Sequence, residues 1–159
     1  MFRDKSEKES ILRLWRKTSR GRLQFELGGL SFAIQKGFTP EEYARHLWSQ
    51  GAKTWIRNNS PSAEKYLLKE VEALRCFYPE IVFEIIEAEE KRAELVFTKE
   101  CLGGWGEDPW RLAKSFNLSK KDICAYCHEA FSIWAQQLDM IADIGPDQDG
   151  ICRLRVIKA

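Results

Sequence analysis

The stretch Tyr78-Pro79-Glu80-Ile81-Val82-Phe83-Glu84-Ile85-Ile86 divides the chain into two parts with different apolar periods. Before it, apolar residues recur every three or four positions, which is the spacing of one face of an α-helix. After it, β-branched and aromatic residues cluster, and residues 93–98 alternate as in a strand. We therefore expect an α+β fold in which a helical part, residues 1–78, packs on a small antiparallel sheet formed within residues 79–159.

The helical part contains several start signals. Apolar residues at helical spacing within residues 11–15 and 23–34 predict helices before a glycine stop. Residues 39–42, Thr-Pro-Glu-Glu, combine an N-cap, a proline at the first helical position and a glutamate three residues after the cap. This capping sequence predicts a helix that continues to about Asn58, and another helix is expected over residues 62–77.

The second part begins with a predicted β-hairpin over residues 82–98, followed after a glycine-rich loop by a short helix over residues 109–116. A capping sequence at Ser119 predicts a long helix that ends only before Gly145. The apolar face expected for this helix consists of Ile123, Cys127, Ala130, Phe131, Trp134, Leu138 and Ile141. Alternation over residues 151–157 predicts a terminal strand.

Length and charge limit the classes of protein to consider. A chain of 159 residues is long enough for one domain with its own core. Its 25 Lys and Arg residues nearly balance its 24 Asp and Glu residues, so the long-range attraction typical of a nucleic-acid-binding protein is absent. The charged N-terminus resembles no signal peptide, and no apolar run reaches the length of a membrane span. We expect a cytoplasmic protein.

The cysteines carry the clearest chemical signal. Residues 124–128, Cys-Ala-Tyr-Cys-His, place two thiols and an imidazole within one and a half turns of a helix, and an odd total of five cysteines argues against a disulfide framework. Periodicity places Cys101, Cys127 and Cys152 on core-facing surfaces of three different elements. We expect these sulfur atoms to meet in one pocket between the long helix and the sheet.

Three interpretations of this cluster remain open. The cysteines could be purely structural, because free cysteine behaves as a small buried hydrophobe. Cys101, Cys124, Cys127, His128 and Cys152 could instead supply a tetrahedral site for zinc or another thiophilic metal. In a catalytic interpretation Cys124 or Cys101 is the nucleophile and His128 its base, with Cys124 favoured because it lies near a helix N-terminus.

Other motifs are less informative. The Cys-x-x-Cys-His string matches c-type haem attachment, but such proteins are exported and the chain shows no export signal. The glycines of residues 103–106 match no phosphate-binding pattern. Trp105 lies within this loop and Trp110 follows it. Both are candidates to line a pocket mouth and contact a bound cofactor, or else to pack in the core.

The order of these segments resembles a known family. Residues 24–28, Gln-Phe-Glu-Leu-Gly, precede a hairpin, a helix with Cys124 and Cys127, and a terminal strand that begins Gly-Ile-Cys-Arg-Leu at residues 150–154. Over roughly residues 22–157 this arrangement resembles the L-2-amino-thiazoline-4-carboxylic acid hydrolase-like proteins and, more distantly, the 4-vinyl reductase domain. The resemblance implies an α+β domain, shared in outline with TRAPP-type transport subunits and often dimeric, and an activity that hydrolyses a cyclic C–N bond.

Together these observations predict a pocket protein that binds a small molecule or a thiophilic metal and hydrolyses a C–N bond of a small heterocycle. Two alternatives remain: a binding module without catalysis, and a dimerising scaffold. An extensive apolar surface on the N-terminal helices would favour the scaffold and a homodimer. No nucleic acid or membrane span is expected.

Overall fold

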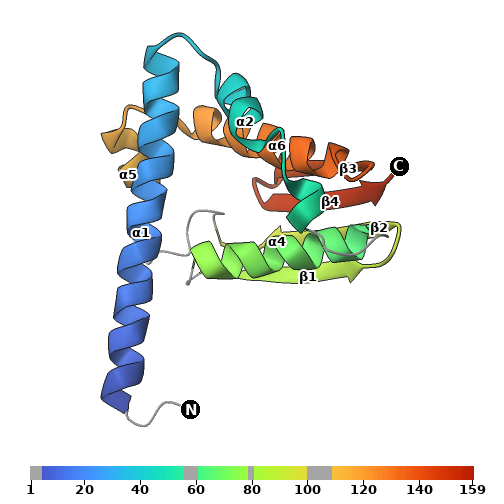
Figure 1. The fold of residues 1–159 in the computed structure, drawn as a ribbon, viewed down its shortest axis with the longest axis horizontal. Helices are drawn as coiled ribbons and strands as arrows, with labels where there is room; N and C mark the ends of the chain where they lie inside the picture. The colour runs from blue at the N-terminus through green and yellow to red at the C-terminus, as the bar shows by residue number, and fades with distance from the viewer. Residues whose placement is uncertain (1–4, 56–60, 79–80, 100–108) are drawn as a thin grey trace.

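The computed structural model describes residues 5–55, 61–78, 81–99 and 109–159 and has the predicted α+β architecture (Figure 1). In chain order its elements are α1 (Lys5–Gln35), α2 (Pro40–Trp48), α3 (Ala52–Trp55), α4 (Ala63–Phe77), β1 (Phe83–Ala88), β2 (Arg92–Phe97), α5 (Pro109–Ser115), α6 (Lys120–Gln136), β3 (Met140–Pro146) and β4 (Cys152–Lys158). The helical N-terminal part, the long C-terminal helix and the terminal strand are all confirmed.

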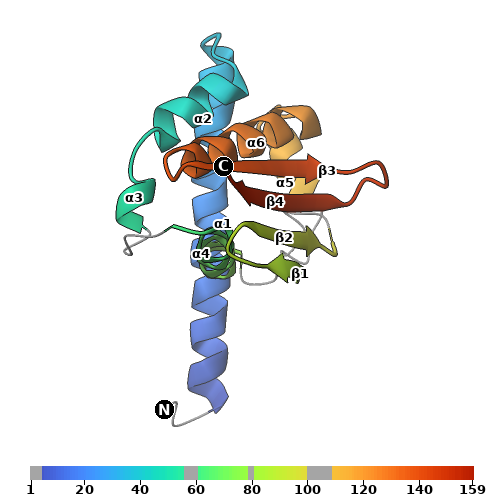
Figure 2. The same ribbon diagram turned by 90° about the vertical axis from the view of Figure 1, so that its right-hand side faces the viewer.

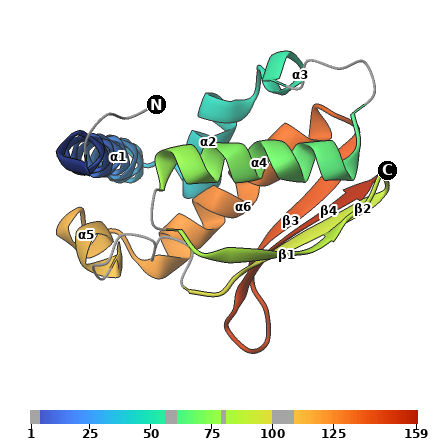
Figure 3. The same ribbon diagram turned by 90° about the horizontal axis from the view of Figure 1, so that it is seen from below.

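The four strands form one antiparallel sheet in the order β1-β2-β4-β3. Two hairpins, β1–β2 and β3–β4, are joined through the pairing of β2 with β4, in which Leu95 lies opposite Leu154. The helices lie on one side of this sheet (Figure 3). The inward-facing residues of the strands therefore meet α4 and α6, while the other face of the sheet carries charged and exposed residues.

The capping sequences act as predicted, although two helix boundaries differ. Thr39 and Ser119 both form capping boxes, at the starts of α2 and α6. The two predicted N-terminal helices are one continuous helix, α1. The helix predicted to reach Asn58 ends at Trp48 instead, because the chain turns at Gly51, which has a φ of 106°. Residues 56–60 lie outside the described residues.

The prediction that the long helix continues to Gly145 is wrong. Helix α6 ends at Gln136, Asp139 adopts a φ of 56°, and residues 140–146 form strand β3. Met140, Ala142 and Ile144 are buried in this strand while Ile141 is 60% exposed. The spacing from Leu138 to Ile141 fits a helix, but the alternation within residues 140–144 fits a strand, and pairing with β4 along its full length decides between them.

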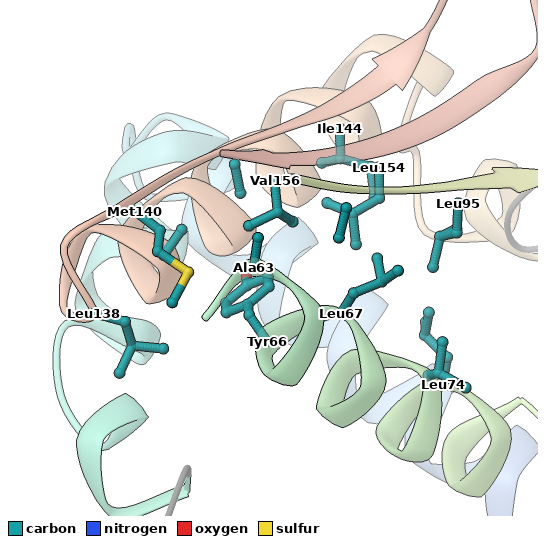
Figure 4. Packing of buried hydrophobic residues seen from close by; sticks show 14 of the residues in the cluster. Ala63, Tyr66, Leu67, Leu74, Leu95, Leu138, Met140, Ile144, Leu154 and Val156 are labelled. Atoms are coloured by element: carbon teal, nitrogen blue, oxygen red, sulfur yellow. The ribbon is translucent and has the colours of Figure 1, made fainter. Parts of the chain in front are cut away.

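Two clusters of buried side chains hold the fold together. In the first, α4 packs on the sheet: Tyr66, Leu67 and Leu74 face Leu95, Leu154 and Val156 (Figure 4). The second joins α1, α2, α5 and α6 through Leu23, Leu27, Leu30, Ala44, Ala113, Leu118, Ile123 and Tyr126. Cys127 packs against both clusters. Helix α6 therefore connects the two parts of the interior.

Helix α1 is only partly covered by the rest of the chain. Its N-terminal part extends beyond the other elements (Figures 1 and 2). The Trp15 indole Nε1 donates a hydrogen bond of 2.8 Å to the Cys76 carbonyl at the end of α4. Leu14 is 64% exposed and Phe25 is 86% exposed. This helix presents an apolar surface that no described residue covers.

Candidate functional site

A pocket of about 1140 Å³ lies between α4 and α6, at the boundary of the two core clusters. Four helices, the segment after α4 and two strands supply its apolar lining. The apolar lining residues are Trp48, Trp55, Leu68, Ala73, Leu74, Phe77, Tyr78, Phe97, Tyr126, Ala130, Phe131, Trp134 and Ile144. Leu68 and Phe77 are exposed, so the pocket opens to solvent along α4.

Three tryptophans form one wall of this pocket. The Trp134 ring lies edge-on to Trp55, with ring centroids 4.8 Å apart, and to Trp48 at 5.8 Å. The Trp134 indole Nε1 is buried and has no hydrogen-bond partner in the part of the chain that the structure describes. A buried donor without an acceptor carries a free-energy cost, which an acceptor on a bound molecule would remove.

A polar network borders the pocket on the side of α1. The Trp48 Nε1 donates to the Tyr126 hydroxyl at 2.9 Å, and that hydroxyl donates to the Glu26 carboxylate at 3.2 Å. Arg22 pairs with the other oxygen of Glu26 at 3.2 Å and stacks on the Phe77 ring at 3.8 Å. Burial, followed by the nearby charge of Glu26, raises the pKa of Tyr126. This hydroxyl therefore stays protonated.

Glu70 contributes a buried carboxyl group from α4. Its residue exposure is 9%, and burial raises its pKa to about 8, although a hydrogen bond from Tyr66 acts in the opposite direction. The Tyr66 hydroxyl has one proton, and it donates that proton to the Phe131 carbonyl at 3.1 Å. Two acceptors thus compete for one proton. A protonated Glu70 resolves this competition because it can donate to the Tyr66 oxygen.

The predicted cysteines separate in space. Cys127 lines the pocket, as does the exposed Cys76. Cys152 packs against the first core cluster, as its strand position predicts, but it does not line the pocket. Cys124 is half-buried one turn before His128 and is also outside the lining. Cys101 lies outside the described residues, so the predicted meeting of three sulfur atoms stays a prediction.

His128 is not among the residues that line the pocket. Its imidazole is exposed, and its Nε2 lies 3.4 Å from the Asp143 carboxylate on the edge strand β3. Within residues 5–55, 61–78, 81–99 and 109–159, no three His, Cys, Asp or Glu side chains are grouped closely enough to hold a metal ion. The metal set that includes Cys101 and the pairing of His128 with a catalytic thiol remain predictions.

The two predicted loop tryptophans contribute differently. Trp110 is half-buried, packs against the second core cluster and has the Lys120 ammonium 5.0 Å from the centre of its ring. It is not part of the pocket lining. Trp105 lies outside the described residues, so its role as a cofactor contact stays a prediction.

Sequence reasoning missed Glu70, although a signal for it exists. The buried positions of α4 are Ala63, Tyr66, Leu67, Glu70, Val71 and Leu74. Glu70 is the charged residue of this stripe, four residues after Tyr66 and four before Leu74, so helical periodicity alone places a carboxyl group on the buried face. Glu26, three residues after Leu23 and four before Leu30, shows the same signal on α1.

Comparison with known proteins adds little to this description. No protein-family model matches the sequence, and no curated protein matches it. Among solved structures, the chain is similar to a crystal structure of a trafficking protein particle complex subunit 3 from Naegleria fowleri covalently bound to palmitic acid. The TM-score is 0.43 and the identity 15%, over 90% of this chain and 96% of that one. A similarity this low carries no inference about function.

In length and apolar character taken together, the described helices fall short of what a membrane span requires. None of them combines the length and the apolar character needed to cross a bilayer.

Proposed function

We propose that this protein binds a small, largely apolar molecule in the pocket between α4 and α6. The observation that carries this proposal is the pocket itself, with a volume of about 1140 Å³ and a lining of aromatic and aliphatic side chains. Ligand sites are typically concave, roughly 300–1,000 Å³ in volume, and mostly apolar with a few converging polar groups. The pocket is slightly larger than this range and has the expected lining.

The polar groups that would orient the ligand come from three elements. Glu70 of α4 and the Trp134 indole of α6 are both buried at the lining. The ion pair of Arg22 and Glu26 borders the pocket from α1. A ligand with an apolar body and one or two polar atoms matches this distribution.

The sequence favours Cys124 as a nucleophile, but a nucleophilic thiol in this pocket would be a different cysteine. Cys127 lines the pocket, whereas Cys124 does not. If a substrate with a cyclic C–N bond occupies the pocket, we assign its nucleophile to Cys127. Loss of turnover in Cys127→Ser, with turnover retained in Cys124→Ser, would support this assignment, and the reverse result would contradict it.

The binding proposal is tested with a neutral fluorescent probe, N-phenyl-1-naphthylamine, whose emission rises in apolar surroundings. We expect saturable binding to the wild-type chain and a loss of about tenfold or more in affinity in Ala73→Trp, which places an indole in the pocket. Leu68→Trp blocks the opening from a more exposed position. Glu64→Trp, on the same helix but outside the lining, is the matched control.

Equal affinity in all four proteins would contradict the proposal, since the probe would then bind elsewhere. Far-UV circular dichroism and thermal unfolding of each variant show whether a loss of binding comes from loss of the fold.

A second candidate function, assembly into a homodimer, is favoured by the exposed face of α1. Ile11, Phe25 and Phe32 are separated by multiples of seven residues, and Leu14 lies three residues after Ile11, so these side chains share one side of the helix. All four are exposed. In a homodimer, the α1 helices of two chains would pack side by side, and each would cover the exposed stripe of the other.

Light scattering after gel filtration tests this candidate. We expect the mass of two chains for the wild type and of one chain for Phe25→Glu, because a charge at the centre of the stripe would be buried without a partner. Phe38→Glu, an exposed aromatic position after the end of α1, is the control and should leave the mass unchanged. A monomeric wild type would contradict this candidate.

A further inference from the structure

Glu70 is a buried carboxyl group at the pocket lining that forms no ion pair within the described parts of the chain, and these surroundings point to a class of ligand. The inference rests on the proposed function, namely that the pocket binds a small molecule. The carboxyl group lies at the lining of the pocket, in a residue that is nine-tenths buried. Its hydrogen-bond partner is the Tyr66 hydroxyl, a neutral group.

The other charged groups of the lining lie in different situations. Glu26 is paired with Arg22 and accepts a hydrogen bond from Tyr126. Glu72 is exposed and pairs with Lys69 at 2.6 Å. The remaining titratable groups that line the pocket are Lys65, Cys76, Tyr78 and Cys127. Among the described residues no Lys, Arg or His side chain forms an ion pair with Glu70, although Lys65 and Lys69 lie on the same helix.

We propose that the pocket selects ligands that carry a protonated amine, which binds at Glu70 while the apolar part of the ligand lies against the aromatic lining. An ammonium group supplies a positive charge to this carboxylate, which forms no ion pair with the side chains that the structure describes. Hydrogen bonds between two charged groups in a site shielded from water are stronger than those between neutral groups. The faces of nearby aromatic rings favour a cation as well.

Ligands of other charge fit less well. A carboxylate ligand would meet Glu70 as a like charge or would need a shared proton, and the pocket's arginine already has Glu26 as its partner. A neutral alcohol could accept a hydrogen bond from protonated Glu70, but it would gain no charge interaction. The expected order of affinity for one apolar body is therefore amine, then alcohol, then carboxylate.

Binding of an amine should also release a proton. Burial holds the pKa of Glu70 at about 8, so the carboxyl group is mostly protonated at neutral pH and must ionise to pair with an ammonium group. Below this pKa the affinity for an amine should rise about tenfold for each unit of pH, and above it the affinity should level off. Primary alkylamines stay protonated throughout this range, because their pKa is near that of lysine.

The test uses three probes with the same alkyl chain: n-octylamine, n-octanol and n-octanoate. Each is titrated into the full chain at pH 8.5, with the fluorescence of the tryptophans at the pocket as the readout. We expect the wild type to bind octylamine about tenfold more tightly than octanol. Calorimetry of octylamine binding at pH 7 in buffers of different ionisation enthalpy should show release of about 0.9 proton.

Glu70→Gln is the decisive variant, since glutamine has the shape of a protonated glutamate and should preserve the fold. In this variant the preference for octylamine and the release of a proton should both disappear, while binding of octanol should persist. Glu72→Gln removes the same charge from an exposed position at the edge of the same pocket and is the matched control. It should retain both effects.

The outcomes separate the two proposals. Equal affinity of the wild type for octylamine and octanol, with Ala73→Trp blocking both, would overturn the amine preference and leave the binding function standing. A preference that survives in Glu70→Gln would also overturn it. If none of the three probes binds, both proposals fail.

Discussion

Glu70 and Glu94 are buried to nearly the same degree, at 9% and 8% exposure, but they lie in opposite surroundings. Glu94 is on the face of the sheet away from the helices, where Arg153 and Arg155 lie 3.2 Å and 3.5 Å from one of its carboxylate oxygens. Arg92 lies 3.8 Å from the other oxygen. Glu70 faces the pocket and has a tyrosine as its partner.

The difference shows how to distinguish a structural carboxylate from one that is available to a ligand. Both residues remove a carboxyl group from water, which costs free energy unless a partner compensates it. On the sheet, Arg153 and Arg155 of the neighbouring strand β4 and Arg92 of the same strand as Glu94 supply the compensating charge. Asp147 holds Arg153 in place at 2.6 Å. In the pocket, no described residue forms an ion pair with Glu70, although Lys65 and Lys69 belong to the lining. Changes at Glu70, Glu94 and the exposed Asp143 test this contrast.

The first prediction concerns the pH dependence of stability. The pKa of Glu70 is about 8 in the folded chain against an ordinary value of 4.5, so the unfolded chain loses this proton first as the pH rises. The contribution of Glu70 to the free energy of unfolding should therefore fall between about pH 4.5 and pH 8, by roughly 4 kcal/mol. Glu70→Gln should lack this fall and gain stability relative to the wild type at pH 9.

Urea unfolding at pH 5 and pH 9 measures this effect. Because other groups titrate over the same range, the relevant quantity is the difference between the wild type and Glu70→Gln at each pH. A difference that does not change with pH would show that Glu70 is ionised in the folded chain.

The second prediction concerns the carboxylate on the sheet. Glu94→Gln leaves three arginines close together without their shared counter-charge. We expect a loss of about 2 kcal/mol at pH 7, below the range for a fully buried pair because the arginines are partly exposed. Raising the salt concentration should recover part of this loss, since salt screens the repulsion between the arginines. A neutral effect at low salt would contradict the contrast between the two glutamates.

The third prediction extends the comparison to an exposed carboxylate. Asp143 and His128 lie 3.4 Å apart on the surface, where solvent screens their interaction. A double-mutant cycle of His128→Asn and Asp143→Asn at pH 5.5 should give a coupling of about 0.5 kcal/mol or less. A coupling of 2 kcal/mol or more would mean that this histidine has a larger structural role than its exposure indicates.

The sequence predicts the fold class well because its strongest signals are local. The capping boxes at Thr39 and Ser119 depend on residues three positions apart, and the terminal strand alternates over seven residues. Strand β3 could not be recognised in this way. Leu138 and Ile141 continue the helical stripe of α6, and the pairing with β4 that makes residues 140–146 a strand is a contact between separate segments.

The candidate site was harder to predict because its chemistry is spread over the chain. The segment of residues 124–128 carries the clearest chemical signal, but its histidine lies at the surface. Of its two cysteines, the second lines the pocket and the first does not. The residues that define the pocket come from segments as far apart as Arg22 and Ile144, and most are aromatic or aliphatic. Periodicity shows that such residues are buried, but it cannot show which of them border a space.

The position of the pocket where the two core clusters meet has a thermodynamic consequence. Cys127 packs against both clusters, and a bound molecule would contact both as well. A ligand that binds only the folded chain stabilises it by about 2.7 kcal/mol at a hundred times its dissociation constant. Because the ligand would contact both clusters, this stabilisation would oppose the separation of the helices of the second cluster from the sheet and α4 of the first. Slower amide hydrogen exchange on both sides of α6 would then report that a ligand occupies the pocket.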